Sequence, residues 1–245
     1  KNMALAEITK NKILLTVPVR EVTPDIKTEL EEVLNNYPIE VIPKKMMSIE
    51  QMRLIYVLFH QWAEEEAGGD YLYIKDVLIG EFCSKYEIPG FSTSPYKENT
   101  LDMETATQFI QFIIELGIEE NRVLYIRDKN QNYKHIRTIV PDIQKYVITC
   151  LRNRVCAICG KRHDEYNTVE LHHWKSVASA VGTYENDDGL STPFISLCTE
   201  HHQEFHGVGV ESFKNKYHIE GVYLNEKLVI ELKEIYTNHF KAFKG

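Results

Sequence analysis

The chain has 245 residues, of which 43% are hydrophobic and 26% are charged, which is typical of a globular protein with one large domain or two ordinary ones. The formal net charge of −8 argues against a protein that coats nucleic acid by bulk positive charge. Its apolar runs are too short to cross a bilayer and no export signal is visible, so we expect a cytoplasmic protein with no membrane partner.

The N-terminal region has a pattern that predicts a β-α-β opening. Residues 4–20 carry apolar side chains at strand spacing, which indicates one or two strands. A helix should begin near Thr23, because Pro24 suits its first turn. A short strand should then cover residues 38–43, which begin and end with proline.

Helical periodicity dominates the middle of the chain. Ser48, with Gln51 three residues later, forms a capping box at the start of one helix, and Gly117 suits the end of another. We therefore expect an α+β protein with a domain boundary near Val140. The predicted helices cover residues 48–67, 74–85, 101–116, 141–153, 210–217 and 226–240.

Residues 122–137 are basic and contain interleaved tyrosines. Five cations and a single acid occur in this stretch, a pattern typical of a groove for single-stranded nucleic acid. A solvated loop or hairpin explains the same composition at least as well. The candidate DNA contacts are Arg122, Arg127, Lys129, Lys134 and Arg137.

Potential metal ligands are concentrated in residues 156–206, which hold three of the five cysteines and six of the ten histidines. Cys156-x-x-Cys159 and Cys198-x-x-His201 have the spacing of two zinc half-sites, and three thiolates with one imidazole make a closed structural site. A Zn²⁺ ion there would join the two ends of a region that has little apolar core of its own.

A second group of histidines lies between and beside these half-sites. Residues 168–174 are strand-like, so His172 and His173 should point to opposite faces and take different roles. His202 and His206 lie four residues apart on a predicted helix, so they share one face. His172 with these two would make a three-ligand site with open positions, as catalytic metal sites have. The histidines predicted to be surface residues are His163, His218 and His239.

The pattern C-x-x-C, V-E-L-H-H and L-C-x-x-H-H-x-x-x-H resembles the HNH endonuclease family with its ββα-metal fold, over residues 156–207. The resemblance implies that His172, His202 and His206 hold a catalytic divalent ion, such as Mg²⁺, Mn²⁺, Ni²⁺ or Zn²⁺. It implies that His173 is the general base in the hydrolysis of DNA, leaving 5′-phosphate and 3′-hydroxyl ends. The implied ligands of the structural zinc are Cys156, Cys159, Cys198 and His201.

The chain departs from this family at the asparagine that normally helps to orient the base. The segment Ser191 to Phe194, where it is expected, contains no asparagine, and Asn186 lies further upstream. The orientation of the base must therefore come from another residue, or the activity is weak. Lys175 would contact a phosphate, although a solvated lysine is the simpler interpretation.

Residues 10–120 resemble the phage Orf family of recombination mediators, which bind single-stranded DNA and single-strand-binding protein as dimers. The resemblance rests on S-x-x-Q-x-R from Ser48, on F-S-T-S from Phe91, and on the elements around them. It implies an Orf-like DNA-binding domain over residues 1–140, with a zinc-stapled HNH domain and trailing helices over residues 141–245. The chain would then act in phage recombination or DNA processing, in the cytoplasm of a bacterial host.

Three functions are compatible with these patterns. The first is a metal-dependent DNA endonuclease with an N-terminal DNA-binding region. The second is a non-catalytic, single-stranded DNA-binding recombination mediator with a structural HNH segment, and the missing asparagine motivates it. The third is a protein-interaction module with two structural zincs. The presence of His173 favours the first, because a scaffold needs no unliganded base.

Overall fold

The computed structural model describes residues 5–9, 12–16, 24, 25, 27, 28, 32, 45–66, 68–94, 96, 97, 99–127 and 130–244. Contacts divide the chain into two units, residues 1–44 and residues 45–245. The expectation of an α+β protein is confirmed, because helices and three small antiparallel sheets occur in the described residues.

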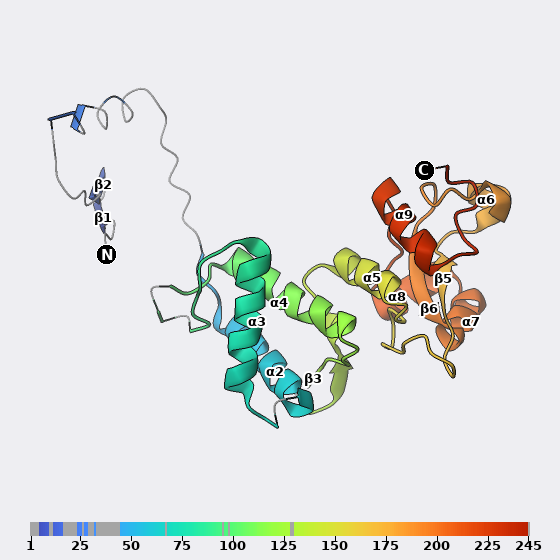
Figure 1. Ribbon diagram of the computed structural model, residues 1–245, viewed down its shortest axis with the longest axis horizontal. Coiled ribbons are helices and arrows are strands. Elements are labelled where there is room, and N and C mark those ends of the chain that lie inside the picture. Colours follow the sequence, from blue (N-terminus) through green and yellow to red (C-terminus); the bar gives the residue numbers. More distant parts are fainter. Residues whose placement is uncertain are drawn as a thin grey trace. The chain divides into compact units, whose positions relative to one another are not determined.

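The first unit contains an antiparallel pair, β1 (Leu5–Thr9) and β2 (Lys12–Thr16), as Figure 1 shows. The prediction of strands in residues 4–20 is therefore confirmed. The strand predicted over residues 38–43 lies outside the described residues, so the β-α-β opening stays a prediction. A helix was also predicted to begin near Thr23. The residues of it that the structure describes are all helical, and they are Pro24, Asp25, Lys27, Thr28 and Glu32.

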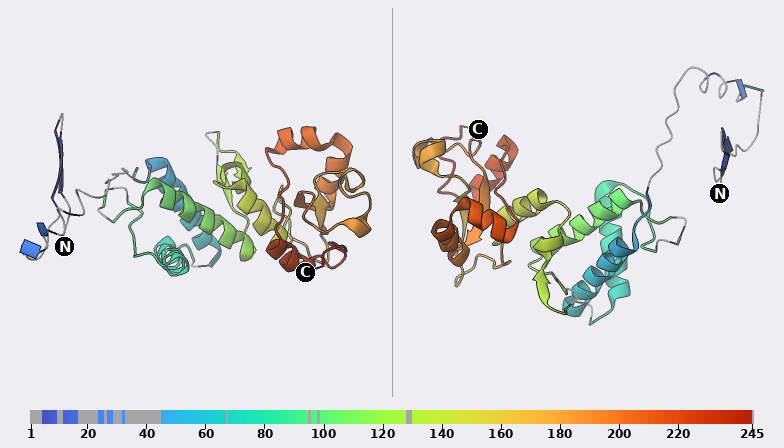
Figure 2. Two further views of the ribbon diagram at one scale, coloured as in Figure 1. Left: turned by 90° about the horizontal axis from the view of Figure 1, so that it is seen from above. Right: turned by 180° about the vertical axis from the view of Figure 1, so that it is seen from behind.

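Three helices, α2 (Ile49–Glu66), α3 (Tyr71–Tyr86) and α4 (Met103–Glu119), lie together in both views of Figure 2. Aromatic side chains form the centre of their packing. The ring of Phe82 lies 4.9 Å from that of Phe109, and Phe109 lies 6.1 Å from Phe59. All three side chains are fully buried, so each helix contributes its apolar stripe to one core.

Helix α4 continues past the glycine that was predicted to end it. Gly117 lies inside the last turn, where a Cβ atom would stand 2.8 Å from Cδ1 of Leu124. The glycine therefore permits a close approach of the following segment, and it does not serve as a helix terminator here. The helix ends two residues later, at Glu119.

A short hairpin and a helix connect this helical group to the C-terminal region. The hairpin pairs β3 (Tyr125–Arg127) with β4 (Tyr133–His135), and a 3₁₀ turn, Ile136–Ile139, leads to α5 (Ile143–Arg152). Gln111 of α4 bonds the backbone of Asp142 in both directions, at 3.0 and 3.4 Å. These bonds cross the predicted domain boundary near Val140, which stays a prediction.

The C-terminal region is built on the antiparallel strands β5 (Val169–His173) and β6 (Phe194–Cys198), with α7 (Thr199–Val208) following β6 directly. Helix α5 packs on β6, and α7 packs on both strands. Between the strands lie α6 (Val177–Ala180) and a 3₁₀ turn, Tyr184–Asn186; α8 (Val210–Tyr217) and α9 (Glu226–Ile235) follow α7. The helix predicted over residues 226–240 is therefore shorter, because the chain turns after Ile235.

The capping box of α2 generates a stability prediction. The Ser48 hydroxyl accepts from the Gln51 N–H at 3.1 Å, and the Gln51 side chain accepts from the Ser48 N–H at 2.9 Å. Replacing Ser48 by Ala should lower the free energy of unfolding by about 1 kcal/mol, as measured by urea denaturation. The control is Ser84→Ala on the exposed face of α3, which should stay within about 0.5 kcal/mol of the parent. Equal values for both variants would contradict a stabilising cap.

Candidate metal centre

The first group of candidate ligands is the cysteine cluster that joins the start of the C-terminal region to its centre. Cys156 and Cys159 lie in a turn after α5, Cys198 ends β6, and His201 lies in the first turn of α7. Their ligand atoms all lie within 4.8 Å of one another. We call this group the clamp.

The spacing of the clamp fits a tetrahedral zinc ion. The Sγ atoms of Cys159 and Cys198 are 3.9 Å apart, and Nδ1 of His201 lies 3.6 Å from Sγ of Cys156 and 3.1 Å from Sγ of Cys198. Ordinary zinc–sulfur and zinc–nitrogen bonds place tetrahedral ligand atoms about 3.5–3.8 Å apart. A small rotation of the His201 ring would complete the fit.

One thiol of the clamp is already held in the form that binds a metal. A hydrogen bond from Cys156 lowers the pKa of the Cys159 thiol to about 3, against the opposing effect of burial, and thiolate is the form that binds zinc. The turn itself depends on Gly160, whose φ of +76° is left-handed and whose missing side chain leaves room for the ring of His135. Burial lowers the pKa of His135 to about 4, so this ring is neutral against the clamp.

A second group joins His172 of β5 to His202 and His206 of α7. The Nε2 atoms of His202 and His206 are 3.1 Å apart, and the ring of His172 lies 4.5 and 5.1 Å from their rings. Nε2 of His172 is buried and has no hydrogen-bond partner in the described residues. Leaving a buried polar atom unpaired is costly, and a divalent ion among the three rings would remove that cost.

The electrostatics of this group favour a neutral ring at His172. Burial, and then the neighbouring rings, lower the pKa of His172 to about 3. Oε2 of Glu170 lies 2.9 Å from Nδ1 of His202, which is the arrangement that orients a metal-binding histidine from behind. Glu170 was not singled out from the sequence, although its position two residues before His172 places both on one face of the strand.

His173, the next residue of β5, points into a different group. Its Nε2 lies 2.9 Å from Oδ2 of Asp187, and both side chains are buried. Burial would raise the pKa of Asp187, but hydrogen bonds from His173 and from the Gly189 N–H outweigh it and hold the pKa below its usual value. The carboxylate therefore stays ionised and fixes the orientation of the ring, with the tautomer that donates from Nε2.

Asp187 makes a contact of the kind that was expected from the missing asparagine, because it bonds the ring of His173. It follows Asn186 directly, but it comes earlier in the chain than the segment Ser191 to Phe194. His239 completes the group, because its ligand atom lies within 4.8 Å of those of His173 and Asp187. The prediction that His239 is a surface residue is wrong: it is half-buried, and its ring lies 5.9 Å from that of His173.

The two histidine groups line the same cleft, which has a volume of about 870 Å³. Arg154, Lys175 and Tyr184 also line it, so it combines two cations and an exposed aromatic ring with the imidazoles. Lys175 bonds the hydroxyl of Tyr223 at 3.0 Å and keeps its amine at the surface. A cleft with convergent imidazoles and nearby cations suits a phosphorylated substrate.

A family model described as "Putative HNHc nuclease" matches residues 21–234. The chain belongs to this HNH nuclease family. Neither a search of the curated proteins nor a search of the solved structures found a match. Membership of the HNH family indicates a nuclease with DNA as its substrate. HNH nucleases use metal ions, which agrees with the cysteine and histidine groups.

No helix in the described part of this chain is long and apolar enough to cross a membrane.

The described residues of the basic stretch 122–137 do not line the cleft. Arg122 is buried over the ring of Trp62 at 4.1 Å, and Arg137 is half-buried over the ring of Tyr217. These contacts indicate packing roles and give no support to the predicted DNA contacts of the two arginines.

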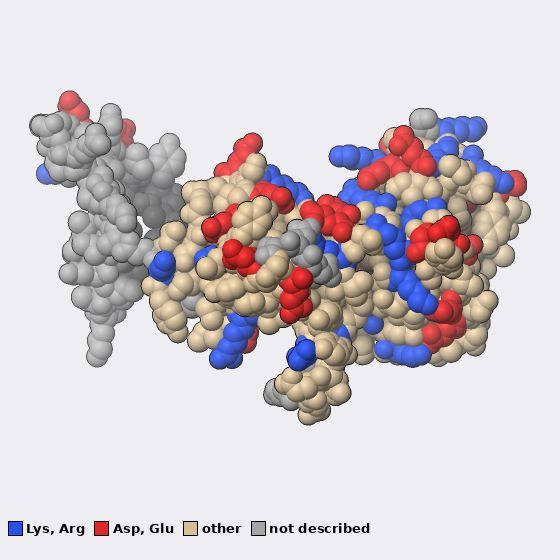
Figure 3. Space-filling view, turned by 60° about the horizontal axis from the view of Figure 1, so that its bottom comes forward, with Lys and Arg blue, Asp and Glu red and all other residues tan. Residues whose placement is uncertain are grey.

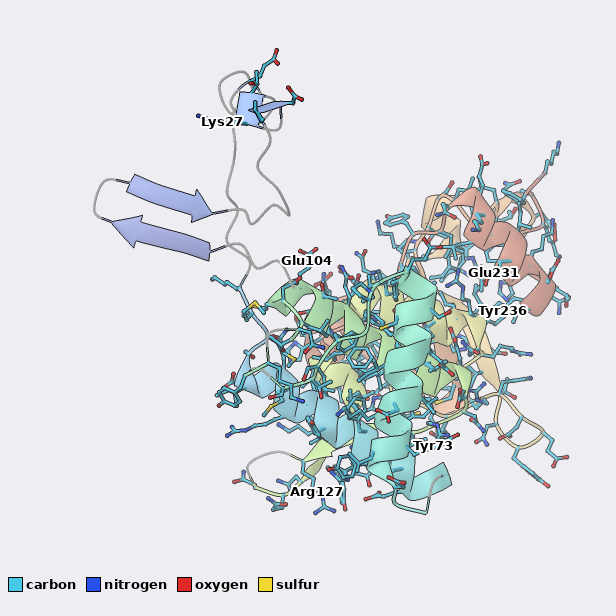
Figure 4. The ribbon with its side chains drawn as sticks, turned by 60° about the vertical axis from the view of Figure 1, so that its left-hand side comes forward. Lys27, Tyr73, Glu104, Arg127, Glu231 and Tyr236 are labelled. Carbon is cyan, nitrogen blue, oxygen red and sulfur yellow. The ribbon has the colours of Figure 1, made fainter. Side chains whose placement is uncertain are left out.

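The hairpin arm of the same stretch is more open. Arg127, labelled in Figure 4, and Lys134 are exposed on it. Lys129 lies outside the described residues. Basic and acidic side chains are interspersed over the face drawn in Figure 3. On that face, DNA binding would therefore depend on local groups more than on one large positive surface.

Removal of a clamp ligand should release zinc and destabilise the C-terminal region. Replacing Cys198 by Ala should reduce the zinc retained after dialysis by about one equivalent per chain and lower the thermal unfolding midpoint, because metal binding contributes directly to folding. The matched control is Cys83→Ser, a half-exposed cysteine of α3 outside every candidate ligand group of the described residues. Mass spectrometry of metal content and a thermal scan give the two measurements. Unchanged zinc in the Cys198 variant would exclude the clamp.

Proposed function

We propose that the chain is a metal-dependent DNA endonuclease that hydrolyses phosphodiester bonds in the cleft between β5 and α7. The observation that carries this proposal is the unpaired, buried Nε2 of His172, which faces two further imidazoles beside the oriented ring of His173. A structural site would close around its ion, whereas three imidazoles at the edge of a cleft leave positions for water and phosphate.

In this proposal β5, β6 and α7 form the ββα-metal module, and the clamp holds Zn²⁺ at its base. His172, His202 and His206 would hold a divalent ion, such as Mg²⁺, Mn²⁺, Ni²⁺ or Zn²⁺, on the side of His206, the exposed member. When bound there, the ion would supply positive charge for the phosphate and for the leaving 3′ oxygen. Glu170 would position His202 through their hydrogen bond.

His173 would be the general base. Its Nε2–H donates to Asp187, which leaves the lone pair of Nδ1 available to accept a proton from water. The ionised Asp187 would also stabilise the imidazolium that forms. Attack of the activated water on phosphorus would leave 5′-phosphate and 3′-hydroxyl ends.

The alternative of a non-catalytic mediator was motivated by the missing asparagine. The hydrogen bond between His173 and Asp187 argues against this alternative, because it gives the proposed base an orienting partner. An Orf-like domain over residues 1–140, a role in phage recombination, a homodimer and an interaction with single-strand-binding protein remain proposals that rest on the sequence resemblance.

Replacing His173 by Ala tests the catalytic role. Cleavage of plasmid and single-stranded DNA with Mg²⁺ or Mn²⁺ should fall by about 100-fold or more, since general-base catalysis typically contributes that much. The zinc held by the clamp should not change. The control is His218→Asn, an exposed histidine with a left-handed φ of 50° that asparagine tolerates. Equal cleavage by the His173 variant and the parent would refute the assignment.

Replacing Asp187 by Asn tests the orienting role. The amide removes the negative charge beside the imidazolium, so the cleavage rate should fall by about 10- to 100-fold. Asp188→Asn is the matched control, because Oδ1 of Asp188 accepts from Leu190 and Ser191 of its own turn and Asp188 is no member of a candidate ligand group in the described residues. The two variants should be compared by initial rates on one DNA substrate. A loss of the same size in both would show that the turn, and not the carboxylate of Asp187, matters.

A further inference from the structure

His239 lies on the segment that follows α9, beyond residues 21–234 that the HNH family model matches. Nothing in the proposed hydrolysis uses this histidine. Even so, its ring lines the cleft and is half-buried next to His173 and Asp187. A second imidazole therefore lies beside the ring of the proposed general base, 5.9 Å from it.

Packing holds the segment of His239 in place. The Ala242 N–H donates to the Asp187 carbonyl at 3.1 Å. The ring of Phe240 is fully buried and lies so close to Gly189 that a Cβ there would stand 2.5 Å from its Cδ1. Phe240 itself has a left-handed φ of 58°, a conformation that persists only where packing enforces it. These contacts fix His239 against the turn that carries Asp187.

The resulting group has the composition of a metal site. His173, Asp187 and His239 each offer one ligand atom, and these atoms lie within 4.8 Å of one another. Nε2 of His173 and Oδ2 of Asp187 are 2.9 Å apart. Bonds of ordinary length to one ion would place such atoms about 3.0–3.4 Å apart, so small movements would accommodate the ion.

We propose that His173, Asp187 and His239 form a further divalent-cation site, which takes Zn²⁺ or a similar borderline ion and blocks the nuclease when it is filled. Two imidazoles and one carboxylate favour Zn²⁺, Ni²⁺ or Co²⁺ over Mg²⁺, which prefers oxygen ligands. Metal binding by these three side chains does not depend on whether the chain cleaves DNA. The blocking effect rests on the proposed function, in which His173 is the base.

The inhibition follows from which nitrogen of the His173 ring carries the proton. In the active state Nε2 of His173 carries the ring proton and Nδ1 carries the lone pair. An ion bound at Nε2 takes the lone pair of that nitrogen, so the neutral ring carries its single proton on Nδ1. The proton moves from one nitrogen to the other through solvent, with no net release. His173 then has no lone pair left to accept a proton from water.

Metal counting tests the site without any cleavage assay. The full chain, stripped of metal and titrated with Zn²⁺ alone, should fill the clamp, the three-histidine group and the new site. Replacing His239 by Gln should remove about one equivalent, whereas His218→Asn should remove none. The variant should still bind the zinc ion of the clamp tightly, which would show that it is folded. An equal count in the His239 variant and the parent would overturn the proposal, whether or not the chain cleaves DNA.

Inhibition tests the consequence. With Mn²⁺ supporting cleavage, added Zn²⁺ should slow the parent and the His218 variant by at least about tenfold more than the His239→Gln variant. Each protein is compared with its own rate before zinc is added. Equal inhibition of all three would contradict the blocking role, because zinc would then act elsewhere, for example by displacing Mn²⁺ from the three-histidine group.

Discussion

The pairing register of β5 and β6 is the constraint on which the rest of the site depends. Val169 lies opposite Cys198, and His173 lies opposite Phe194. Because α7 begins directly after Cys198, this register sets the clamp at one end of the pair and brings His202 and His206 alongside His172. A slip of one residue would exchange the faces of His172 and His173, and each ring would enter the wrong group.

Successive side chains of β5 point to opposite faces, so the neighbouring residues His172 and His173 lie in two different chemical environments. On one face the unpaired ring nitrogen of His172 lies beside two further imidazoles, and on the other face the ring of His173 is paired with an ionised carboxylate. Neighbouring groups of this kind would disturb each other if they shared a face, since charge interactions strengthen as burial increases. The sheet keeps them apart while leaving both open to one cleft.

The features of this site that can be predicted from the sequence are those formed by residues close together in the chain. The clamp half-sites, the helical pair His202 and His206, and the strand alternation at His172 depend on neighbours within four residues, and simple geometry relates them. The contribution of Asp187 depends on how the connection between the strands folds, and that of His239 on the return of the C-terminal segment; no short pattern encodes either.

With a metal ion bound, the clamp would join Cys159 to Cys198, which are 39 residues apart, and would act as a cross-link around a loop. In the chain-entropy view, closing a loop of this length restricts the unfolded chain by roughly 4 kcal/mol, as a disulfide would. Unlike a disulfide, such a cross-link would not respond to thiol reductants and would open instead with acid or a chelator. A backbone break within the enclosed loop would therefore leave the fragments joined until the metal is withdrawn.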